Sequence, residues 1–314
     1  MTSLRAVARH VGTPAETSTR RIVGRPTGRT VLRARRAPFS VMTQNMALLV
    51  APGNYLGTNR EGAIVGLVAE VRRQAPDVVG LCEVFDDDER DHIRHDLANT
   101  HPFFVEGPDE ADLESDGGLL VLSRHPFTAT SSLIYRDCAG FDCFANKGVL
   151  HVRVQPPGVL AGWDLFYTHM QNIEEDDGDD TLFSQLSVLH DMIRRDADPV
   201  LPTIVFGDLN IPATIANHYR ELVTRLGQPT DLWVVAGNPV VSGFTYVRDT
   251  NFYEDADDRP ARDERLDYML LRRGGRAIPI LQGIEVLSIR HDGRLISDHL
   301  GVMARFAETL TIDG

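Results

Sequence analysis

Apolar positions recur along the chain with the periods of both strands and helices. Alternating or continuous apolar runs predict β-strands, which we place at residues 39–46, 77–84, 117–123, 147–154, 163–170, 203–210, 265–271, 278–288 and 300–306. Apolar residues at helical spacing predict helices, which we place at 59–74, 87–98, 181–196 and 214–226. Asn59 is the expected N-cap of the first helix.

The order of these elements points to an α/β fold. Strands outnumber helices and several follow one another directly, which favours mixed sheets faced by helices over a purely parallel doubly wound sheet. No internal repeat and no Pro/Gly-rich linker interrupts residues 37–314, so we predict a single domain there. The acidic stretches 174–180 and 253–264 are predicted to be solvated loops.

Residues 1–36 differ from the rest of the chain in charge. They hold nine of the 32 basic residues and one of the 45 acidic residues, giving a net charge of +8. The remainder therefore has 23 basic and 44 acidic residues, a net charge of −21. We predict that 1–36 is a disordered basic tail, with an anionic membrane or nucleic-acid tether as the alternative. The acidic body disfavours generic binding of duplex DNA.

Composition also bears on compartment. With 42% hydrophobic and 25% charged residues, the chain has the composition of a soluble globular protein. The basic start lacks the apolar stretch of a secretory signal, which favours the cytoplasm. Secretion is the alternative, because Cys138 and Cys143 in "DCAGFDC" could close a small loop in an oxidising compartment. Cys82 lies in an apolar strand and is expected to be buried.

Polar residues occur where the predicted strands begin or end, and these positions are Asn45, Glu83, His169, Asp208, Asn210, Asp267, Asp298 and His299. Strand ends along one rim of a sheet are where binding groups converge. Amides, carboxylates and imidazoles without thiolates suit Mg²⁺ or Mn²⁺ better than Zn²⁺. A divalent ion implies an anionic substrate, most often a phosphate ester. Each residue alone also has a structural explanation, such as a turn, a cap or a buried ion pair; their joint occurrence predicts a site.

The sequence resembles a known superfamily, on stretches that read "TQNM", "LCEVFD", "GGLLVLSRHPF", "YTHMQ", "VFGDLN", "RLDYMLL" and "SDHLGV". They are similar to the endonuclease/exonuclease/phosphatase superfamily, which includes deoxyribonucleases, abasic-site endonucleases, inositol polyphosphate phosphatases and neutral sphingomyelinases. The resemblance covers about residues 38–307. Within that group, "EVFD", "THMQ" and a cysteine-containing loop running into "NKG" are most similar to bacterial neutral sphingomyelinases of the sphingomyelinase C type.

The resemblance implies a fold and a metal centre. The implied fold is a four-layer α/β sandwich, with two mixed β-sheets packed face to face and helices outside. Glu83 would be the main metal ligand, with Asn45 beside it and Asp298 contributing to the metal environment. His299 would be the general base on the attacking water, and Asp267 would orient its imidazole.

The resemblance also implies groups that position the phosphate. Asp208 would position the water or a second metal, while Asn210 and His169 would donate hydrogen bonds to the non-bridging oxygens. The residues expected near the substrate are Asn146, Lys147 and Gln171. Lys147 is the only lysine in the chain, and a strand-start lysine of no catalytic importance is its alternative interpretation.

The expected activity is magnesium-dependent hydrolysis of a lipid phosphodiester, sphingomyelin or a related choline phospholipid, with manganese or cobalt able to replace magnesium. We expect a monomer with peripheral membrane contact. The alternatives are a metal-dependent nuclease, an inositol phosphate phosphatase and a catalytically inactive binding domain. Sphingomyelinases commonly carry an aromatic-tipped hairpin that enters the membrane. In the corresponding region here the aromatic residues are mixed with acids and are expected to pack internally; they are Phe244, Tyr246, Phe252 and Tyr253.

Overall fold

A computed structural model describes most of the chain after residue 32, namely residues 33–36, 38–49, 59–108, 117–157, 162–173, 178–248, 251–253, 259–272, 274, 279–307 and 309–312. One compact unit, Leu32–Asp313, contains every element named below. The first 32 residues of the predicted tail, and residues 174–177 and 254–258 of the acidic stretches, lie outside the described residues.

The centre of this unit is a pair of six-stranded sheets. In spatial order, the first sheet contains β12 (Leu281–Leu287), β15 (Gly301–Phe306), β2 (Phe39–Leu48), β3 (Val78–Val84), β5 (Leu119–Ser123) and β4 (Phe103–Gly107). The second contains β10 (Thr230–Asp231), β11 (Asp267–Arg272), β9 (Thr203–Asp208), β8 (Trp163–His169), β7 (Gly148–Val154) and β6 (Phe127–Ile134). Both sheets are mixed, because β2–β3 and β8–β9 are parallel and the other pairs are antiparallel.

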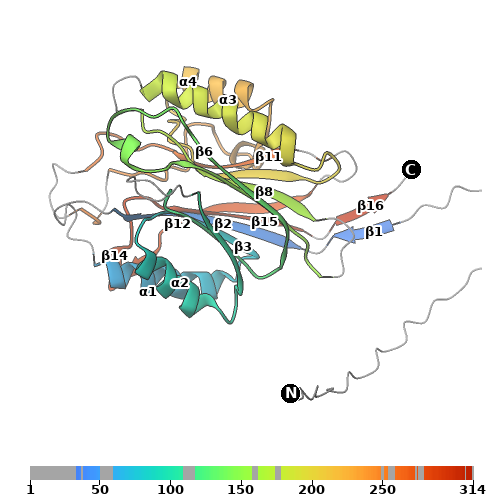
Figure 1. The fold of residues 1–314 in the computed structure, drawn as a ribbon, viewed down its shortest axis with the longest axis horizontal. Helices are drawn as coiled ribbons and strands as arrows, with labels where there is room; N and C mark the ends of the chain where they lie inside the picture. The colour runs from blue at the N-terminus through green and yellow to red at the C-terminus, as the bar shows by residue number, and fades with distance from the viewer. Residues whose placement is uncertain are drawn as a thin grey trace, which may run out of the picture. The chain divides into compact units, whose positions relative to one another are not determined.

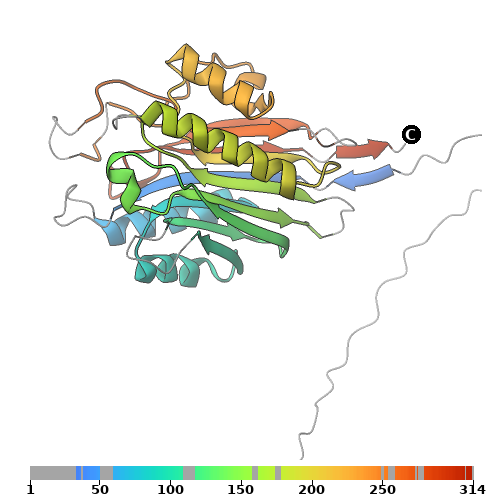
Figure 2. The same cartoon turned by 45° about the horizontal axis from the view of Figure 1, so that its top comes forward.

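Helices cover the outer face of each sheet (Figure 1). Helices α1 (Arg60–Gln74) and α2 (Asp87–Leu97) share an apolar cluster with the first sheet. Helices α3 (Gly178–Asp196) and α4 (Ala216–Arg225) share another with the second sheet. Two shorter helices, η1 (Gly140–Phe144) and α5 (Leu232–Val235), lie in connections. Figure 2 shows the same order of helices, strands, strands and helices, so the predicted four-layer sandwich is confirmed.

The two parallel pairs explain where the long helices occur. Parallel neighbours need a crossover, which α1 supplies between β2 and β3 and α3 supplies between β8 and β9. Asn59 caps α1 as predicted, since its side chain accepts the backbone N–H of Gly62. The helix ends at Ala75, which adopts a left-handed conformation.

The main core lies between the sheets. It is built from inward-facing residues of both, including Val41 and Val78 on one side and Leu165 and Phe206 on the other. Cys82 is fully buried in the same cluster, as predicted. This continuous apolar packing fixes the two sheets against each other, so residues at their common rim are held on a rigid support.

The structure adds strands that the apolar pattern did not indicate. In β6 the central side chains are small or hydroxylated and every position is half-buried or exposed, and β4 is a short strand at the edge of its sheet with two exposed phenylalanines. A hairpin joins β13 (Arg290–His291) and β14 (Arg294–Leu295). The last four residues of the predicted tail form β1 (Arg33–Arg36), which pairs with β16 (Thr309–Ile312).

Two further expectations are settled by the fold. Phe252 and Tyr253 are buried, so those two aromatic residues pack internally as expected. Cys138 and Cys143 are joined by a disulfide bond. In the part of the chain that the structure describes, no helix is long and apolar enough to cross a membrane.

Candidate active site

Strand register brings three of the predicted residues into one row. Asp208 at the end of β9 is paired directly with His169 of β8 on one side and with Asp267 of β11 on the other. The first sheet contributes Asn45 from β2 and Glu83 from β3. An Asn45–Asp208 hydrogen bond of 3.0 Å connects the two groups, so the site lies at the rim that both sheets share.

The backbone around these residues adopts conformations that ordinary side chains avoid. Glu83 and Asn210 have φ angles of 55° and 51°, in the left-handed region, which costs a non-glycine residue about 1–2 kcal/mol. Gly207, next to Asp208, has φ 128°, and a Cβ there would lie 2.1 Å from the carbonyl oxygen of Thr168. Strained residues of this kind cluster at functional sites, where the surrounding structure holds them in place.

Asn45 holds two carboxylates together. Its Nδ2 donates to Glu83 Oε1 at 2.8 Å and to Asp208 Oδ2 at 3.0 Å, while its Oδ1 accepts the backbone N–H of Ala47 at 3.0 Å. In this arrangement Asn45 braces the acidic pair, and its carbonyl oxygen would face a metal only after the amide rotates.

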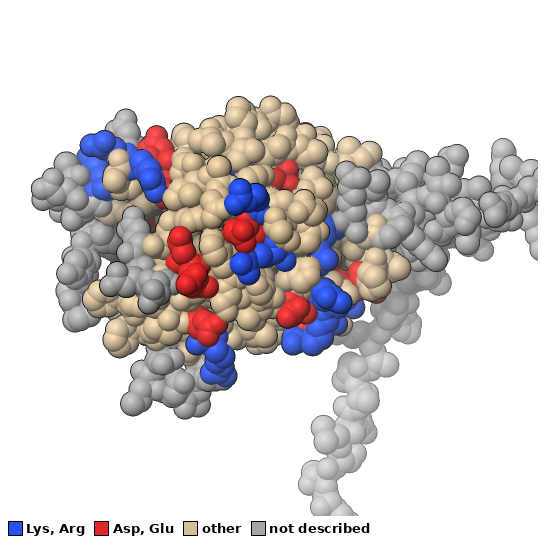
Figure 3. All heavy atoms as spheres, turned by 90° about the horizontal axis from the view of Figure 1, so that it is seen from above, with Lys and Arg blue, Asp and Glu red and all other residues tan. Residues whose placement is uncertain are grey.

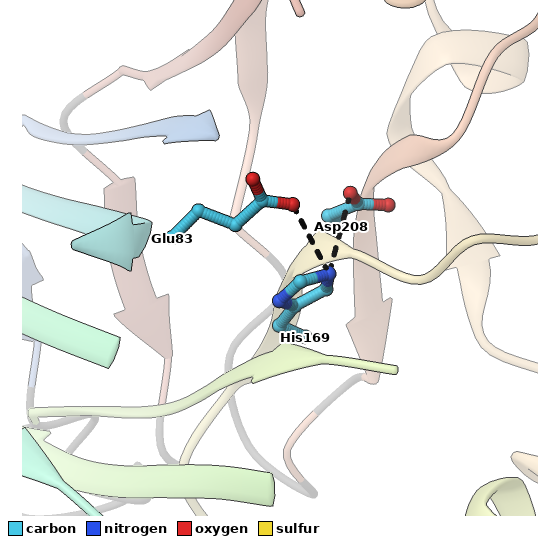
Figure 4. Close-up of side chains that lie close together, drawn as sticks. All are labelled: Glu83, His169 and Asp208. Carbon is cyan, nitrogen blue, oxygen red and sulfur yellow. Dashed lines mark ion pairs between the residues drawn. The ribbon is translucent and has the colours of Figure 1, made fainter. Parts of the chain in front are cut away.

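Glu83, His169 and Asp208 converge on one point (Figure 4). His169 Nε2 lies 3.7 Å from Glu83 Oε1 and 3.8 Å from Asp208 Oδ2. Burial, and after it the charge of Asp298, raises the pKa of Glu83 to about 7. Burial is the largest influence on Asp208 and acts in the same direction, but His299, His169 and the hydrogen bonds from Asn45 and the Asn210 backbone together outweigh it and lower the pKa of that carboxyl.

His299 and Asp267 form a hydrogen-bonded pair. His299 Nδ1 lies 2.8 Å from Asp267 Oδ2, which leaves Nε2 facing the site, 3.8 Å from Asp208 Oδ2. Asp267 is held in turn by its backbone N–H, which donates to Thr245 Oγ1 at 3.2 Å. Burial alone would lower the pKa of His299, but Asp267 and Asp208 outweigh it and raise the pKa well above its usual value. The pair therefore fixes the orientation of His299 and makes its Nε2 strongly basic, so the imidazole can act as a base only from its neutral form.

Lys147 supplies a buried positive charge next to this cluster. Its Nζ donates to Asp142 Oδ2 at 2.8 Å and to the carbonyl oxygen of Met170 at 2.9 Å, and it lies 3.2 Å from His169 Nε2. Burial, followed by the charge of Lys147, lowers the pKa of His169 to about 3. His169 is therefore neutral at neutral pH, and its Nε2 accepts the hydrogen bond from the ammonium.

The remaining predicted residues, Asp298, Asn210 and Asn146, make different kinds of contact. Asp298 accepts a hydrogen bond from the Tyr253 hydroxyl at 2.8 Å and lies close enough to Glu83 to raise its pKa. Asn210 uses one N–H to donate to the Met170 carbonyl at 2.7 Å. Asn146 is buried, and its Nδ2 has no hydrogen-bond partner among the described residues.

Gln171, which was expected near the substrate, contacts backbone groups beside the site. Its side chain is fully buried and binds the backbone of Ala139, accepting the N–H at 2.9 Å and donating to the carbonyl at 3.1 Å. A second bond from its Nε2 reaches the Asn172 carbonyl at 3.1 Å. With these contacts the amide anchors the disulfide-closed loop, and its role at the substrate stays a prediction.

Three residues at the site were not predicted to act there. Asp142 binds Lys147, Tyr253 binds Asp298, and the Tyr246 ring lies with its centroid 5.0 Å from that of His299. Asp142 could have been suspected from its position between the two cysteines of a short loop that runs into "NKG". The two tyrosines lie in an irregular segment, where no periodic pattern marks them.

Comparison with known families gives one match. A family model described as the Endonuclease/Exonuclease/phosphatase family matches residues 42–299, which include most of the two sheets and the site. No curated protein matches the chain.

Solved structures share the fold at low sequence identity. Sphingomyelinase C from Streptomyces griseocarneus has a TM-score of 0.69 and 22% identity, covering 87% of this chain and 100% of that one. A Staphylococcus aureus beta toxin variant with bound magnesium ions has a TM-score of 0.70 and 16% identity, covering 86% and 100%. D. rerio TDP2, complexed with a single-strand DNA product, has a TM-score of 0.66 and 19% identity, covering 86% and 99%.

Proposed function

This chain belongs to the Endonuclease/Exonuclease/phosphatase family, and on that premise we propose that it is a magnesium-dependent phosphodiesterase acting on sphingomyelin or a related choline phospholipid. Members of the family are metal-dependent hydrolases of phosphoric diesters. The observation that carries the catalytic part of the proposal is the buried His299–Asp267 pair, directed at Asp208.

The acidic cluster is suited to a divalent cation. Glu83 and Asp208 are held by one amide group, and Asp298 lies near enough to raise the pKa of Glu83. Buried carboxylates so close together repel one another until a cation neutralises them. Their oxygen atoms are the ligands that Mg²⁺ and Mn²⁺ prefer, so we assign Glu83, Asp208 and Asp298 to the metal. A bound divalent ion supplies charge neutralisation at the phosphate oxygens.

The chain's own residues then account for proton transfer. In the proposed reaction His299 Nε2 accepts the proton of the attacking water, and Asp267 stabilises the resulting imidazolium through Nδ1. Asp208, 3.8 Å from that Nε2, is placed to orient the water between them.

The opposite side of the site provides hydrogen-bond donors for the phosphate. Lys147 and Asn146 lie next to each other, and Asn146 has a buried Nδ2 without a partner among the described residues. Since His169 Nε2 now accepts from Lys147, the imidazole can donate from that atom only after the ammonium moves to a phosphate oxygen and the ring proton shifts from Nδ1 to Nε2. These donors would stabilise charge on the non-bridging oxygens as phosphorus becomes five-coordinate.

Charge distinguishes a lipid from a polyanionic substrate. Among the described residues, the hydrogen bonds and ion pairs of the site involve one ammonium, from Lys147, and no guanidinium. On the face over α3 and α4, basic and acidic side chains are interspersed without a basic stripe (Figure 3). A nucleic acid or an inositol polyphosphate would require several cations, whereas a choline lipid carries one phosphate charge. The similarity of "EVFD", "THMQ" and "NKG" to sphingomyelinases also supports the lipid.

A nuclease is the second candidate. The likeness to D. rerio TDP2, whose structure was solved with a DNA product, and the +8 charge of residues 1–36 favour it.

For localisation, the Cys138–Cys143 disulfide supports an oxidising compartment over the cytoplasm.

A substrate panel tests the proposal. The purified protein with Mg²⁺ is offered sphingomyelin, lysophosphatidylcholine, abasic-site DNA and an inositol polyphosphate, and a His299→Ala variant is assayed in parallel. We expect release of phosphocholine by the wild type and none above background by the variant. Cleavage of the DNA without release of phosphocholine would replace the lipid proposal with the nuclease.

A further inference from the structure

Two phenylalanines are the most exposed large hydrophobic side chains among the described residues. Phe141 is 81% exposed and Phe144 is 69% exposed. Their ring centroids are 6.5 Å apart, so the two rings form one apolar surface. A phenyl ring has no polar atom, and contiguous exposed apolar surface marks an interaction site.

The segment that carries these rings is fixed in place. Both residues belong to η1. Phe141 lies inside the loop closed by the Cys138–Cys143 disulfide, and Phe144 follows that loop as the last residue of η1. Gln171 binds the backbone of Ala139 at the start of the loop, and Gln185 Nε2 donates to the Asp137 carbonyl at 2.8 Å. Because the loop is anchored, the exposure of its rings is a property of the folded chain.

The loop is also connected to the candidate active site. Asp142, between the two phenylalanines in sequence, accepts hydrogen bonds from Lys147 Nζ at 2.8 Å and from the Asn172 backbone N–H at 2.7 Å. Lys147 in turn contacts His169. The green helix at the left of Figures 1 and 2 is η1, at the opposite end of the strands from the β1–β16 pair.

We propose that Phe141 and Phe144 are the surface through which this protein docks on an uncharged lipid interface, bringing the active site to the headgroups. The proposal rests on the lipid phosphodiesterase function, since a lipid substrate must be met at the surface of a membrane. Insertion of the two rings removes their apolar area from water. At the end of η1 the Ala145 N–H donates to the Asp142 carbonyl, and the two rings are the part of the segment that would enter the hydrocarbon boundary.

The charge of the chain selects the kind of lipid surface. The whole chain has a net charge of −13, and Asp137 and Asp142 lie within the loop region. An anionic bilayer would repel this surface, whereas a zwitterionic bilayer of choline lipids would not. The surface also differs from the region expected to carry membrane aromatics, where Phe252 and Tyr253 are buried.

Vesicle partitioning tests the surface without relying on catalysis. The full chain is sedimented with phosphatidylcholine–sphingomyelin vesicles in the presence of a chelator. We expect the partition coefficient of the Phe141→Ser/Phe144→Ser variant to fall at least about tenfold, because burial of even one phenyl ring is worth about that factor. The Phe141→Leu/Phe144→Leu variant, which keeps an apolar surface, should remain within about threefold of the wild type. Ile280→Ser, at another side chain that is 59% exposed, should leave partitioning unchanged.

Partitioning and activity separate the two proposals. The docking surface would be overturned if the Ser/Ser variant and the wild type partitioned equally. It would also be overturned if the wild type did not partition at all, as expected if the rings bind another protein instead of a membrane. Wild type that partitions through the rings but releases no phosphocholine would retain the surface and reject the lipid phosphodiesterase. Where phosphocholine is released, the ratio of turnover on vesicles to turnover on a soluble monomeric phosphodiester should fall about tenfold in the Ser/Ser variant.

Discussion

Lys147 Nζ lies 3.2 Å from His169 Nε2, and both side chains are almost excluded from solvent. Two basic residues can be buried at this distance because the imidazole is neutral. Burial and the adjacent ammonium lower the pKa of His169 to about 3, so only one of these two groups carries a positive charge. Asp142 balances that charge from the disulfide loop. The single lysine of the chain is thus held between a carboxylate and the residues assigned to the phosphate.

Replacing Lys147 with arginine tests whether a compact ammonium is needed. A guanidinium is larger and planar, and it cannot place one donor atom within reach of Asp142, His169 and the Met170 carbonyl at once. We expect kcat to fall about 10- to 100-fold, as for a misplaced positioning group. Thermal unfolding should change little by comparison. An unchanged kcat would leave Lys147 as a strand-start residue without a role in turnover.

The His299–Asp267 pair predicts two losses of different size. His299→Ala removes the proposed base and should reduce kcat about 10²- to 10⁴-fold. Asp267→Asn keeps the size of the side chain but removes the charge that stabilises the imidazolium, so its kcat should fall as well. Steady-state kinetics with Mg²⁺ present would measure both. If Asp267→Asn retained wild-type kcat, orientation of His299 through Nδ1 would be unnecessary for the reaction.

Much of the fold followed from apolar runs. Strands such as β9 and β15 are buried on both faces, so nearly every position is apolar and the pattern is easy to detect. Polar residues that end such runs, including Glu83 and Asp208, stood out for the same reason. Edge strand β6 was not predicted because the alternating faces of its central segment, "TATSS", both carry small or hydroxylated side chains, which differ little in hydrophobicity.

The missing parts of the site depend on distant contacts. Tyr253 reaches Asp298 across 45 positions of sequence, from an irregular segment without periodicity. Gln171 was assigned to the substrate because it follows His169 in a family-like stretch. Its role is set by the backbone of Ala139, 32 positions away, which no local pattern reveals.

The assignment of Glu83 to the metal predicts that its charge contributes to the affinity for a divalent cation. Glu83→Gln preserves the side-chain volume and the ability to accept from Asn45, but it removes a charged ligand. We expect the dissociation constant for Mn²⁺, measured by calorimetry, to rise at least about tenfold. Glu106→Gln, which removes a carboxylate paired with Arg94, is the control and should leave Mn²⁺ binding unchanged. Equal Mn²⁺ affinity of Glu83→Gln and wild type would place the metal elsewhere.

The disulfide loop predicts a coupled loss of stability and activity. Cys138→Ser/Cys143→Ser opens a crosslink between cysteines five positions apart, and the chain-entropy model gives a stability loss of about 2 kcal/mol. Since Asp142 in this loop holds Lys147, kcat should also fall several-fold. Urea unfolding and steady-state kinetics would measure the two effects. A loss of stability with unchanged kcat would show that Asp142 does not depend on the crosslink for its position.

The contacts of Asp164, which lies outside the candidate active site, lead us to expect that the free energy of unfolding falls at acid pH. It is fully buried and contacts His151 Nε2 at 2.8 Å, Arg153 Nε at 2.8 Å and the Asp198 backbone N–H at 2.7 Å. Burial would raise its pKa, but these partners outweigh burial and lower it. The stabilisation is therefore complete above the unfolded pKa of about 3.9 and is lost as pH falls through the lower folded pKa. Asp164→Asn leaves Arg153 without its charged partner and should lower the free energy of unfolding at pH 7 by about 3 kcal/mol. In urea titrations the difference in free energy of unfolding between the variant and the wild type should shrink below about pH 4. A difference that does not change with pH would show that the ionised carboxylate is not what stabilises this contact.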